Sequence, residues 1–398
     1  MSNIPKLRFP EFKGEWEKSE LGKFTQEITR VNPNSDAPIM MISAANGFIL
    51  QSNKYSKEMT GQSLKKYIEL HAGEFAYNHG ASKLKKYGAC FCLDLDKARI
   101  PFVYHCFKLT EGNTKFFSYL LNRTQLDSEL ARYISSSARM DGLLNISYTD
   151  YMKINISVPT LAEQQKIADF LSNVDSIITA ETKILNTLQK KKKALMQKLF
   201  TQQLRFKSDN GKDFPAWEEK KLGDVCSYIG GGTPSKKVKE YWNGNINWAS
   251  VKDITGKYLY ETQDKISQLG ADSSATNICE PDSLLLITRM SPGKTVITKC
   301  ITAINQDLKI VKSDINVEFL HLLFQSIQTK IDEKTSGTTV KGISIEGLNQ
   351  IDIRLPCKAE QQKIADCLSS IDSLIQNQQK VVSTWQQRKK ALLQQMFV

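Results

Sequence analysis

The octapeptide AEQQKIAD occupies residues 162–169, and the same octapeptide returns at residues 359–366. The two copies are 197 positions apart, close to half of the 398-residue chain. A hydrophobic residue and a proline precede each copy and a lysine-rich segment follows it: Val158-Pro159 and KKALMQKLF at 192–200, then Leu355-Pro356 and KKALLQQMF at 389–397. A repeat of this extent indicates two tandem half-length units.

A second pair of matching segments opens each half. LRF stands at 7–9 and 204–206, and a tryptophan and a Leu-Gly pair come soon after: Trp16 with Leu21-Gly22, and Trp217 with Leu222-Gly223. Between these frames the halves barely resemble each other. A constant frame around a variable interior predicts one scaffold that carries two different domains. The expected boundaries are 1–159 for the first domain, 160–203 for a first long helix, 204–356 for the second domain and 357–398 for a second long helix.

The composition limits the class of protein. A chain of 398 residues, 40% of them hydrophobic, is long enough for two or more cores. A net charge of +12 and a pI near 9.1 attract polyanions, of which nucleic acid is the first candidate. The sequence contains no run of eighteen apolar residues and no signal-peptide pattern, which predicts a cytoplasmic protein with no membrane contact.

The eight cysteines form no CxxC pair. Cys90, Cys92, His105 and Cys106 form the densest group, but ACFCLDL at 89–95 is typical of a strand whose alternate residues share one face. Structural zinc sites usually use CxxC-type spacing. We therefore expect small buried hydrophobic residues here and no metal.

Beyond each proline, hydrophobic residues recur at alternating steps of four and three, the heptad pattern of a helix with one apolar seam. The seam residues are Ile167, Leu171, Val174, Ile178, Leu185 and Leu188 in the first half, and Ile364, Leu368, Ile371, Ile375, Val382 and Trp385 in the second. Two matching seams predict that the helices pair as an antiparallel coiled coil. The alternative is that each stripe packs separately against its own domain.

Polar residues interrupt the seams at matching places. Glu181 and Lys192 interrupt the first seam, and Gln378 and Lys389 interrupt the second. In an antiparallel pair this predicts a register in which Glu181 faces Lys389 and Lys192 faces Gln378. At ~1.5 Å per residue, about forty helical residues make a rod of roughly 60 Å.

Short β-branched runs between turn residues, with one or two helices, predict that both interiors are α+β domains. A loop rich in small, polar and basic residues follows a strand in each, within 71–88 and 279–295, and a second such loop lies within 135–147 and 335–345. Arg and Lys can bond guanine edges, Asn and Gln adenine edges, and Ser and Thr phosphates. The candidate DNA-binding residues are Asn78, His79, Ser82, Lys83, Lys85, Lys86, Thr233, Ser235, Lys236, Lys237, Arg289, Lys294, Thr338 and Lys341.

Two tryptophans in the second interior, Trp242 and Trp248, have two possible roles. They could stack on bases, as aromatic residues do in proteins that bind single strands. Large aromatic side chains more often fill a core, which is the role that we expect here.

The sequence contains no catalytic constellation. The Gly-rich turn at 230–234 lacks the GxGxxG spacing, and GKT at 293–295 is no P-loop because Thr288 replaces the required glycine. The Asn/Asp-Pro-Pro-aromatic tetrad of amino-methyltransferases is absent, and no acidic cluster supports metal-dependent cleavage. We therefore predict a non-catalytic chain without a cofactor or metal of its own.

In combination, these segments resemble the specificity subunits of type I restriction-modification systems. The resemblance rests on VPTLAEQQKIAD at 158–169, LPCKAEQQKIAD at 355–366, and the GGTPS…YWNGNINWASVKDI run at 231–254. The first domain lacks the TPS…W run, so the resemblance gives less support to its candidate DNA-binding residues.

The resemblance implies two target-recognition domains joined by two long helices, each reading one half of a bipartite asymmetric target in double-stranded DNA. It also implies assembly with two modification subunits, which bind S-adenosylmethionine and methylate adenine. Restriction subunits that use ATP and Mg²⁺ would complete the complex.

Two functions of other classes remain open from the sequence. The chain could be a two-headed adaptor for proteins, or a nuclease with an unrecognised site. A steep fall in DNA affinity with rising salt would separate a DNA-binding protein from an adaptor. Intact DNA after incubation with Mg²⁺ would exclude the nuclease.

Overall fold

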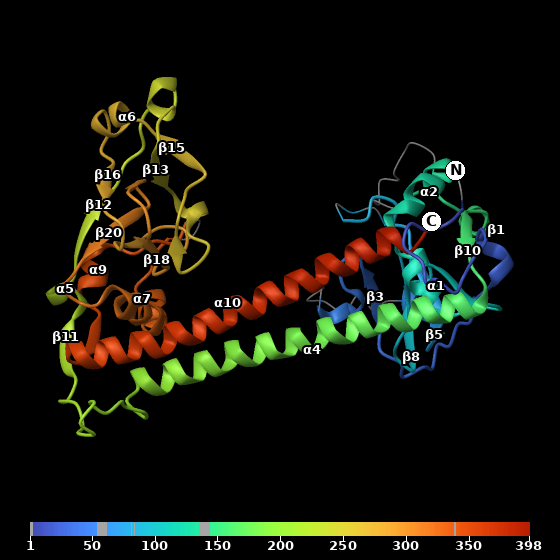
Figure 1. The fold of residues 1–398 in the computed structure, drawn as a ribbon, viewed down its shortest axis with the longest axis horizontal. Coiled ribbons are helices and arrows are strands. Elements are labelled where there is room, and N and C mark those ends of the chain that lie inside the picture. The colour runs from blue at the N-terminus through green and yellow to red at the C-terminus, as the bar shows by residue number, and fades with distance from the viewer. Residues whose placement is uncertain (1–2, 54–61, 81, 83, 135–143, 338–339) are drawn as a thin grey trace. The chain divides into compact units, whose positions relative to one another are not determined.

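The computed structural model describes residues 3–53, 62–80, 82, 84–134, 144–337 and 340–398 (Figure 1). The chain divides into two compact units: the first comprises 1–182 with 380–398, and the second comprises 183–379. Each unit therefore contains one globular domain and a part of both long helices.

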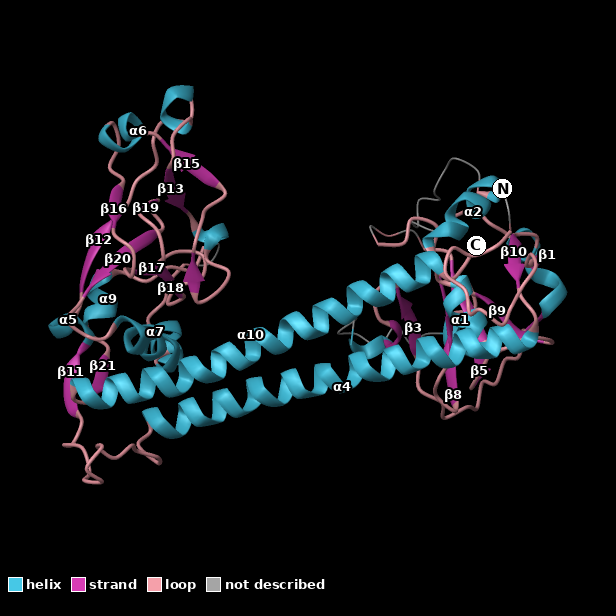
Figure 2. Cartoon of the chain, viewed as in Figure 1, coloured by secondary structure: helices cyan, strands magenta, loops and turns pink. Residues whose placement is uncertain are grey.

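The central sheet of the first unit is antiparallel and has the order β2 (Thr25–Glu27), β9 (His105–Leu109), β6 (Phe75–Asn78) and β7 (Ala89–Cys92). Three antiparallel ladders accompany it: β1 (Glu17–Glu20) with β10 (Asn155–Val158), β3 (Met40–Ser43) with β4 (Gly47–Leu50), and β5 (Ile68–His71) with β8 (Lys97–Ile100). The short helices are α1 (Thr114–Leu121), α2 (Asp127–Tyr133) and α3 (Tyr148–Met152) (Figure 2).

The second unit has a five-stranded sheet in the order β12 (Ser227–Gly230), β20 (Leu308–Lys312), β17 (Leu284–Ile287), β18 (Thr295–Thr298) and β14 (Tyr258–Leu259). A second sheet has the order β15 (Asp264–Ile266), β13 (Ile246–Ala249), β19 (Thr302–Ile304) and β16 (Asn277–Cys279), and a separate ladder joins β11 (Glu218–Lys221) to β21 (Asp352–Leu355). The short helices are α5 (Leu222–Val225), α6 (Gln268–Asp272), α7 (Val317–Ser326), α8 (Gln328–Glu333) and α9 (Ile345–Asn349).

The two units repeat the same sheet order although their interiors differ in sequence. The order β2-β9-β6-β7 in the first corresponds to β12-β20-β17-β18 in the second, with the same antiparallel pairings. The next helix, α1 or α7, starts with an asparagine cap in both: Asn113 Oδ1 accepts from the Phe116 amide at 2.9 Å, and Asn316 Oδ1 from the Phe319 amide at 3.0 Å. The predicted α+β class with two repeated domains is confirmed.

Two long helices follow the repeated octapeptide segments. They are α4 (Leu161–Phe200) and α10 (Lys358–Gln395), and each is continuous. All residues predicted for the two apolar seams are buried or half-buried along both helices. Among the described residues, no helix combines the length and the apolarity that a membrane span requires.

The ends of the long helices contribute to the domain cores. In the first unit, the Phe397 ring after the end of α10 stacks on Phe116 of α1 with centroids 5.3 Å apart. In the second unit, Phe200 at the end of α4 stacks on Phe319 of α7 with centroids 5.5 Å apart. The start of one helix and the end of the other thus pack into the same core within each unit.

Two ion pairs join the long helices within the units. Lys389 Nζ lies 2.5 Å from Asp175 Oδ1 in the first unit, and Lys192 Nζ lies 2.5 Å from Asp372 Oδ1 in the second. Each lysine meets an aspartate six positions before its predicted partner, which was Glu181 for Lys389 and Gln378 for Lys192. A lysine is long enough to reach a carboxylate beside the seam, so the seam pattern alone does not determine its partner.

Candidate nucleic-acid interface

The repeated octapeptide joins each domain to its long helix through a buried carboxylate. Glu163 is only 1% exposed. It accepts from Arg8 Nε and Nη2 at 2.8 Å each, and from Trp16 Nε1 at 3.3 Å. A bidentate charged pair of this kind orients both groups. The opening LRF segment is thereby joined to the start of α4.

The second unit forms the same junction. Glu360 accepts from Arg205 Nε at 3.1 Å, from Arg205 Nη2 at 2.7 Å and from Trp217 Nε1 at 3.0 Å. The hydrogen bonds to Glu360 raise the pKa of the Arg205 guanidinium. The opening and closing blocks of each repeat, which are distant in sequence, therefore meet at one ion pair.

The first glutamine of the octapeptide fastens two further segments. Gln164 Nε2 donates to the Pro159 carbonyl at 2.9 Å, and its Oε1 accepts from the Asn113 amide at 2.9 Å. The second unit has the same bonds, at 2.9 and 3.2 Å, among Gln361, Pro356 and Asn316. The octapeptide is thus scaffold, so any difference in what the two domains bind must come from other segments.

Two predicted loops of the second unit lie side by side. The Met290 amide, after β17, donates to the Lys341 carbonyl at 2.9 Å. An isolated bridge also pairs Arg289 with Gly342. Arg289 and Lys341 therefore share one region of the surface. Thr338, predicted in the same loop, lies outside the described residues.

A third predicted segment packs against this region. The Gly-rich loop at 231–234 lies against the turn at 305–307, between β19 and β20, and Thr233 Oγ1 donates to Gln306 Oε1 at 2.5 Å. Ser235, the next candidate residue, is exposed. We call Thr233, Arg289, Gln306 and Lys341 the turn surface.

The turn surface is basic and accessible. Arg289 Nη1 lies 3.4 Å from Asp307 Oδ1, and the Arg289 side chain remains 57% exposed. Lys309 on β20 is half-buried, and its Nζ lies 3.1 Å from where a Cβ of Gly230 would lie. The remaining basic candidates of this unit are exposed: Lys236, Lys237, Lys294 and Lys341.

The loop after β6 in the first unit is the counterpart of the loop after β17. Asn78 Oδ1 accepts from the Gly80 amide at 2.9 Å and its Nδ2 donates to the Ile42 carbonyl at 3.3 Å, so this side chain shapes the start of the loop. Ser82 Oγ accepts from the Lys85 amide at 3.0 Å and closes a turn. Lys83 lies outside the described residues.

The two lysines of this loop have different environments. Lys85 donates to the Asn122 carbonyl, and burial lowers the pKa of its ammonium group. Lys86 is exposed, and its Nζ lies 5.2 Å from the centroid of the Tyr87 ring. Lys86 is therefore the more accessible of the two for a phosphate.

The side chain of His79, a candidate for DNA contact, is enclosed and only 7% exposed. Its Nδ1 lies 2.7 Å from the Leu144 carbonyl oxygen, and its Nε2 lies 2.8 Å from that of Val103. The ring also stacks on His105, with centroids 5.0 Å apart. His79 connects three segments beneath the loop, which a local sequence pattern does not reveal.

The cysteine and histidine group of the first unit is part of its core. Burial raises the pKa of the Cys90 thiol to about 12 and that of Cys92 to about 12. Burial also lowers the pKa of His105, whose Nε2 lies 3.0 Å from the Ile146 carbonyl oxygen. Across the described parts of the chain, no three His, Cys, Asp or Glu side chains gather as metal ligands.

The two tryptophans of the second interior pack against each other edge to face, with ring centroids 5.1 Å apart. Trp248 is buried, and its Nε1 donates to the Gly232 carbonyl at 3.1 Å. Trp242 is half-buried, and its Nε1 donates to the Ser235 carbonyl at 3.2 Å. Both indole N–H groups thus hold the Gly-rich loop, and the predicted core role is confirmed for Trp248.

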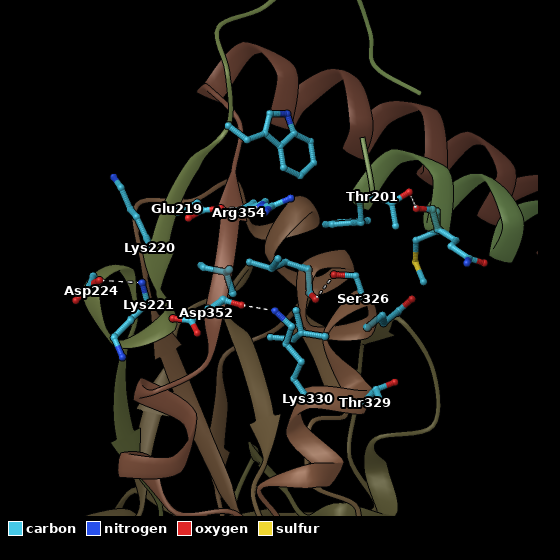
Figure 3. A pocket seen from close by; sticks show the side chains of 18 of the residues that line it. Thr201, Glu219, Lys220, Lys221, Asp224, Ser326, Thr329, Lys330, Asp352 and Arg354 are labelled. Carbon is cyan, nitrogen blue, oxygen red and sulfur yellow. Dashed lines mark hydrogen bonds and ion pairs between the residues drawn. The ribbon is translucent and has the colours of Figure 1, made fainter. Parts of the chain in front are cut away.

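A pocket of about 1250 Å³ lies in the second unit, lined by the end of α4 together with residues of β11, β21, α7 and α8 (Figure 3). Ser326 lies on its wall. At the matching position of the first unit, Arg123 is only 8% exposed and donates to the Val398 carbonyl at 2.9 Å. The pocket lies where the domain meets the end of α4, and it contains no residue of the turn surface.

A sequence model of the type I restriction modification DNA specificity domain matches residues 32–190 and, a second time, residues 216–383. The two matches span most of the chain. The chain belongs to this family.

Several family members resemble the chain in sequence. It is 32% identical over 180 residues to the type I restriction enzyme MjaIX specificity subunit of Methanocaldococcus jannaschii, covering 44% of this chain and 42% of that protein. It is 29% identical over 243 residues to the EcoR124I/EcoR124II specificity subunit of Escherichia coli, covering 58% of each. These alignments span less than two thirds of either relative. The putative MjaX specificity subunit aligns more completely, at 24% identity over 98% of this chain and 95% of that protein.

Two solved structures have the same fold. One comes from work on complex assembly and conformational transition of the type I R-M system, with a TM-score of 0.57, 17% identity and coverage of 96% of this chain and 97% of that chain. The other is the type I restriction-modification S subunit of M. genitalium, with a TM-score of 0.57, 14% identity and coverage of 99% of both chains. At these identities the likeness concerns the fold alone.

Several residues of the site escaped the sequence prediction. Gln306, Asp307 and Lys309 belong to a turn and a strand outside the repeated and matching segments that the sequence offered for the resemblance. Arg8 and Arg205 hold the junction carboxylates but stand in short segments near the start of each repeat. Two signals were available: the turn-forming Asn-x-Asp pattern at 305–307, and the LRF segment repeated at 7–9 and 204–206.

Proposed function

We propose that the chain is the non-catalytic DNA sequence-recognition subunit of a type I restriction-modification complex, acting in the cytoplasm. Each domain would read one half of a bipartite asymmetric target. One observation carries the proposal: four strands of the central sheet have the same order in both units and the octapeptide junction is the same, whereas the loops after β6 and β17 differ. A constant scaffold with two unlike loop sets suits two different half-sites.

Different side chains of the loops would contact bases and phosphates. In the second unit, Arg289 and Lys341 lie together, and an arginine can donate twice to a guanine edge. The exposed Lys236, Lys237 and Lys294, and Lys86 in the first unit, suit phosphates. Phosphate contacts would supply affinity and set the orientation, and the base contacts would supply specificity.

We further propose that α4 and α10 pair as an antiparallel coiled coil that sets the distance between the half-sites. The protected seams and the pairs Lys389–Asp175 and Lys192–Asp372, each within its own unit, support this. A helix of about forty residues is roughly 60 Å long, enough to hold two DNA-reading domains about one helical turn of DNA apart, or ~35 Å.

We propose the partners by analogy with the family. Two modification subunits would bind S-adenosylmethionine and methylate adenine, and restriction subunits would use ATP and Mg²⁺, so this chain itself would need no cofactor. A methylase must flip its target base out of the helix, so the chain would hold a distorted duplex.

The test is to prepare the complete methyltransferase and map the modified adenines by sequencing. The proposal predicts a bipartite target with an unspecified gap. Arg289→Ala should relax preference in one half only, and Lys86→Ala should weaken binding without changing either sequence. A single continuous target, or altered preference in both halves from Arg289→Ala, would contradict the proposal.

The two other function classes need separate controls. DNA affinity should fall steeply as salt rises, with a slope set by the number of phosphate contacts, whereas a protein adaptor would show no such DNA binding. The purified chain with Mg²⁺ should leave DNA intact, and cleavage would identify it as a nuclease.

A further inference from the structure

We propose that Gln306 reads a base in the second half-site, and that Thr233 orients its amide so that hydrogen-bond donors face the DNA. This inference rests on the proposed function and assigns a specificity-determining residue within it. Gln306 is exposed at the apex of the 305–307 turn, and the next residue, Asp307, pairs with the guanidinium of Arg289.

The turn that presents Gln306 is internally rigid. Asn305 is buried, and its Oδ1 accepts from the Asp307 amide at 3.0 Å, as in an Asx turn. The Asn305 amide donates to the Ala249 carbonyl of β13 at 2.9 Å, and the Leu308 amide donates back to the Asn305 carbonyl at 3.3 Å. The backbone on both sides of Gln306 is therefore fixed to strands, which suits a residue that must meet a base edge in one orientation.

The Gly-rich loop packs directly against the same turn. A Cβ on Gly231 would lie 2.3 Å from the Asn305 carbonyl oxygen, so only glycine allows this approach. The Gly232 amide also donates to the Ile304 carbonyl at 3.0 Å. This contact brings Thr233 next to Gln306.

The hydroxyl of Thr233 determines which end of the amide is free. Thr233 Oγ1 donates to Gln306 Oε1 at 2.5 Å, so the oxygen is occupied and the Nε2 group offers its two N–H donors. In the major groove, those donors match guanine N7 and O6, adenine N7 or thymine O4. They do not match the amino group of cytosine, which is itself a donor.

Arg289 is held by the same turn and also presents donors. Its Nη1 lies 3.4 Å from Asp307 Oδ1, and the Thr288 amide donates to the Asp307 carbonyl at 2.9 Å. Gln306 and Arg289 are thus two exposed donor groups that the same turn carries or holds. The ligand chemistry that fits them is a base edge rich in acceptors, of which guanine is the best match.

The experiment compares Gln306→Ala, Gln306→Glu and wild type in the complete methyltransferase, on DNA with each base of the second half-site varied. Gln306→Ala should reduce discrimination at one base about 10- to 100-fold and leave the first half-site unchanged. Gln306→Glu replaces outward donors by an acceptor, so the preference at that base should move toward adenine or cytosine, which offer amino groups.

Thr233 supplies a second test and a matched control. Thr233→Val keeps the shape but removes the hydroxyl, and should weaken discrimination at the same base. Thr233→Ser keeps the hydroxyl and should preserve it. Thermal unfolding of each variant would show that these exposed substitutions leave the fold intact.

Two results would overturn the inference. One is unchanged base preference at every position in Gln306→Ala, and the other is a Gln306-dependent position that is a cytosine. In both cases a bipartite target that still responds to Arg289→Ala would leave the proposed function standing. A wild-type complex that methylates no defined target would instead refute the proposed function itself.

Discussion

At the scale of single residues, the octapeptide is repeated because its side chains meet fixed partners. Glu163 and Glu360 are nearly inaccessible, and each is satisfied by an arginine and an indole N–H. A buried carboxylate needs such partners because desolvation of an unpaired charge is costly. The two copies of the octapeptide thus have identical residues because both domains share one structural requirement.

We predict that Glu360→Gln destabilises the second unit by about 3 kcal/mol, because it leaves the Arg205 guanidinium without its carboxylate in a largely buried site. Urea-induced unfolding followed by tryptophan fluorescence would measure the change. The control is Glu219→Gln, which removes the ion pair between Glu219 and Arg354. The Arg354 side chain is 58% exposed and the Glu219 side chain is 75% exposed. That change should cost no more than about 0.5 kcal/mol, and equal effects of both substitutions would contradict the prediction.

His321 of α7 gives the second unit a pH dependence. Burial, together with the nearby Lys257 and Lys192, lowers the pKa of His321 to about 4. The neutral ring fits its partners, since Gln325 Nε2 lies 2.7 Å from Nε2 and the Thr295 hydroxyl 2.8 Å from Nδ1. Glu318 and Asp372 also lie near enough to act on it, in the opposite direction.

The sign follows from proton binding. An unfolded histidine takes up a proton near pH 6.5, whereas folded His321 does so only near 4. The contribution of neutral His321 to the free energy of unfolding is therefore fully present above about pH 6.5. It falls as the pH drops toward 4, by about 2 kcal/mol between pH 7 and pH 5. The stability difference between wild type and His321→Gln, measured in urea, should shrink by that amount over this range. A difference that stays constant with pH would disprove it.

At the scale of elements, the two long helices carry protected seams that the heptad pattern predicted residue by residue. The pattern did not predict which polar residues pair. Asp175 accepts from Lys389 and also from the Tyr119 hydroxyl of α1, at 2.7 Å. The ion pair therefore connects the end of α10 both to α4 and to the first domain.

We predict that Lys389→Glu lowers the stability of the first unit by about 1 kcal/mol, because two carboxylates would then face each other at a half-buried site. Thermal unfolding would measure the loss. The control is Lys390→Glu, which makes the same charge change at an exposed neighbouring position and should have little effect. A larger loss of stability in Lys390→Glu would mean that net charge, and not the pair with Asp175, causes the effect.

At the scale of the whole molecule, the chain is a structural duplication whose copies share more than their sequences show. Each compact unit combines one domain with the start of one long helix and the end of the other. The sheet order is the same in both, and the loops differ. Under the proposed function, this organisation would allow one domain to change what it reads without altering the other.

The proposed helix pair leads to a prediction about the target. An insertion of four residues, about one helical turn, near Thr182 should lengthen the tolerated gap between the half-sites and leave both half-site sequences unchanged. Mapping modified adenines on DNA with gaps of different lengths would measure this. An altered half-site sequence with an unchanged gap would show that the helices do not set the spacing.

The sequence by itself determined the duplication, the α+β class, the long helices and their buried faces, because periodicity and repeats are written along the chain. It also located the loops that carry Thr233, Arg289 and Lys341. It placed Arg289, Lys341 and Thr233 among the candidates without showing that they lie together.

Only the tertiary structure decided which residues meet. His79 and Arg289 stand at the ends of equivalent strands, yet one is enclosed by segments far along the chain and the other is exposed. Gln306 became a candidate only because the Gly-rich loop, more than seventy positions earlier, packs onto its turn. Contacts between distant segments depend on how strands order in a sheet and where loops pack, and no local pattern of residue types specifies them.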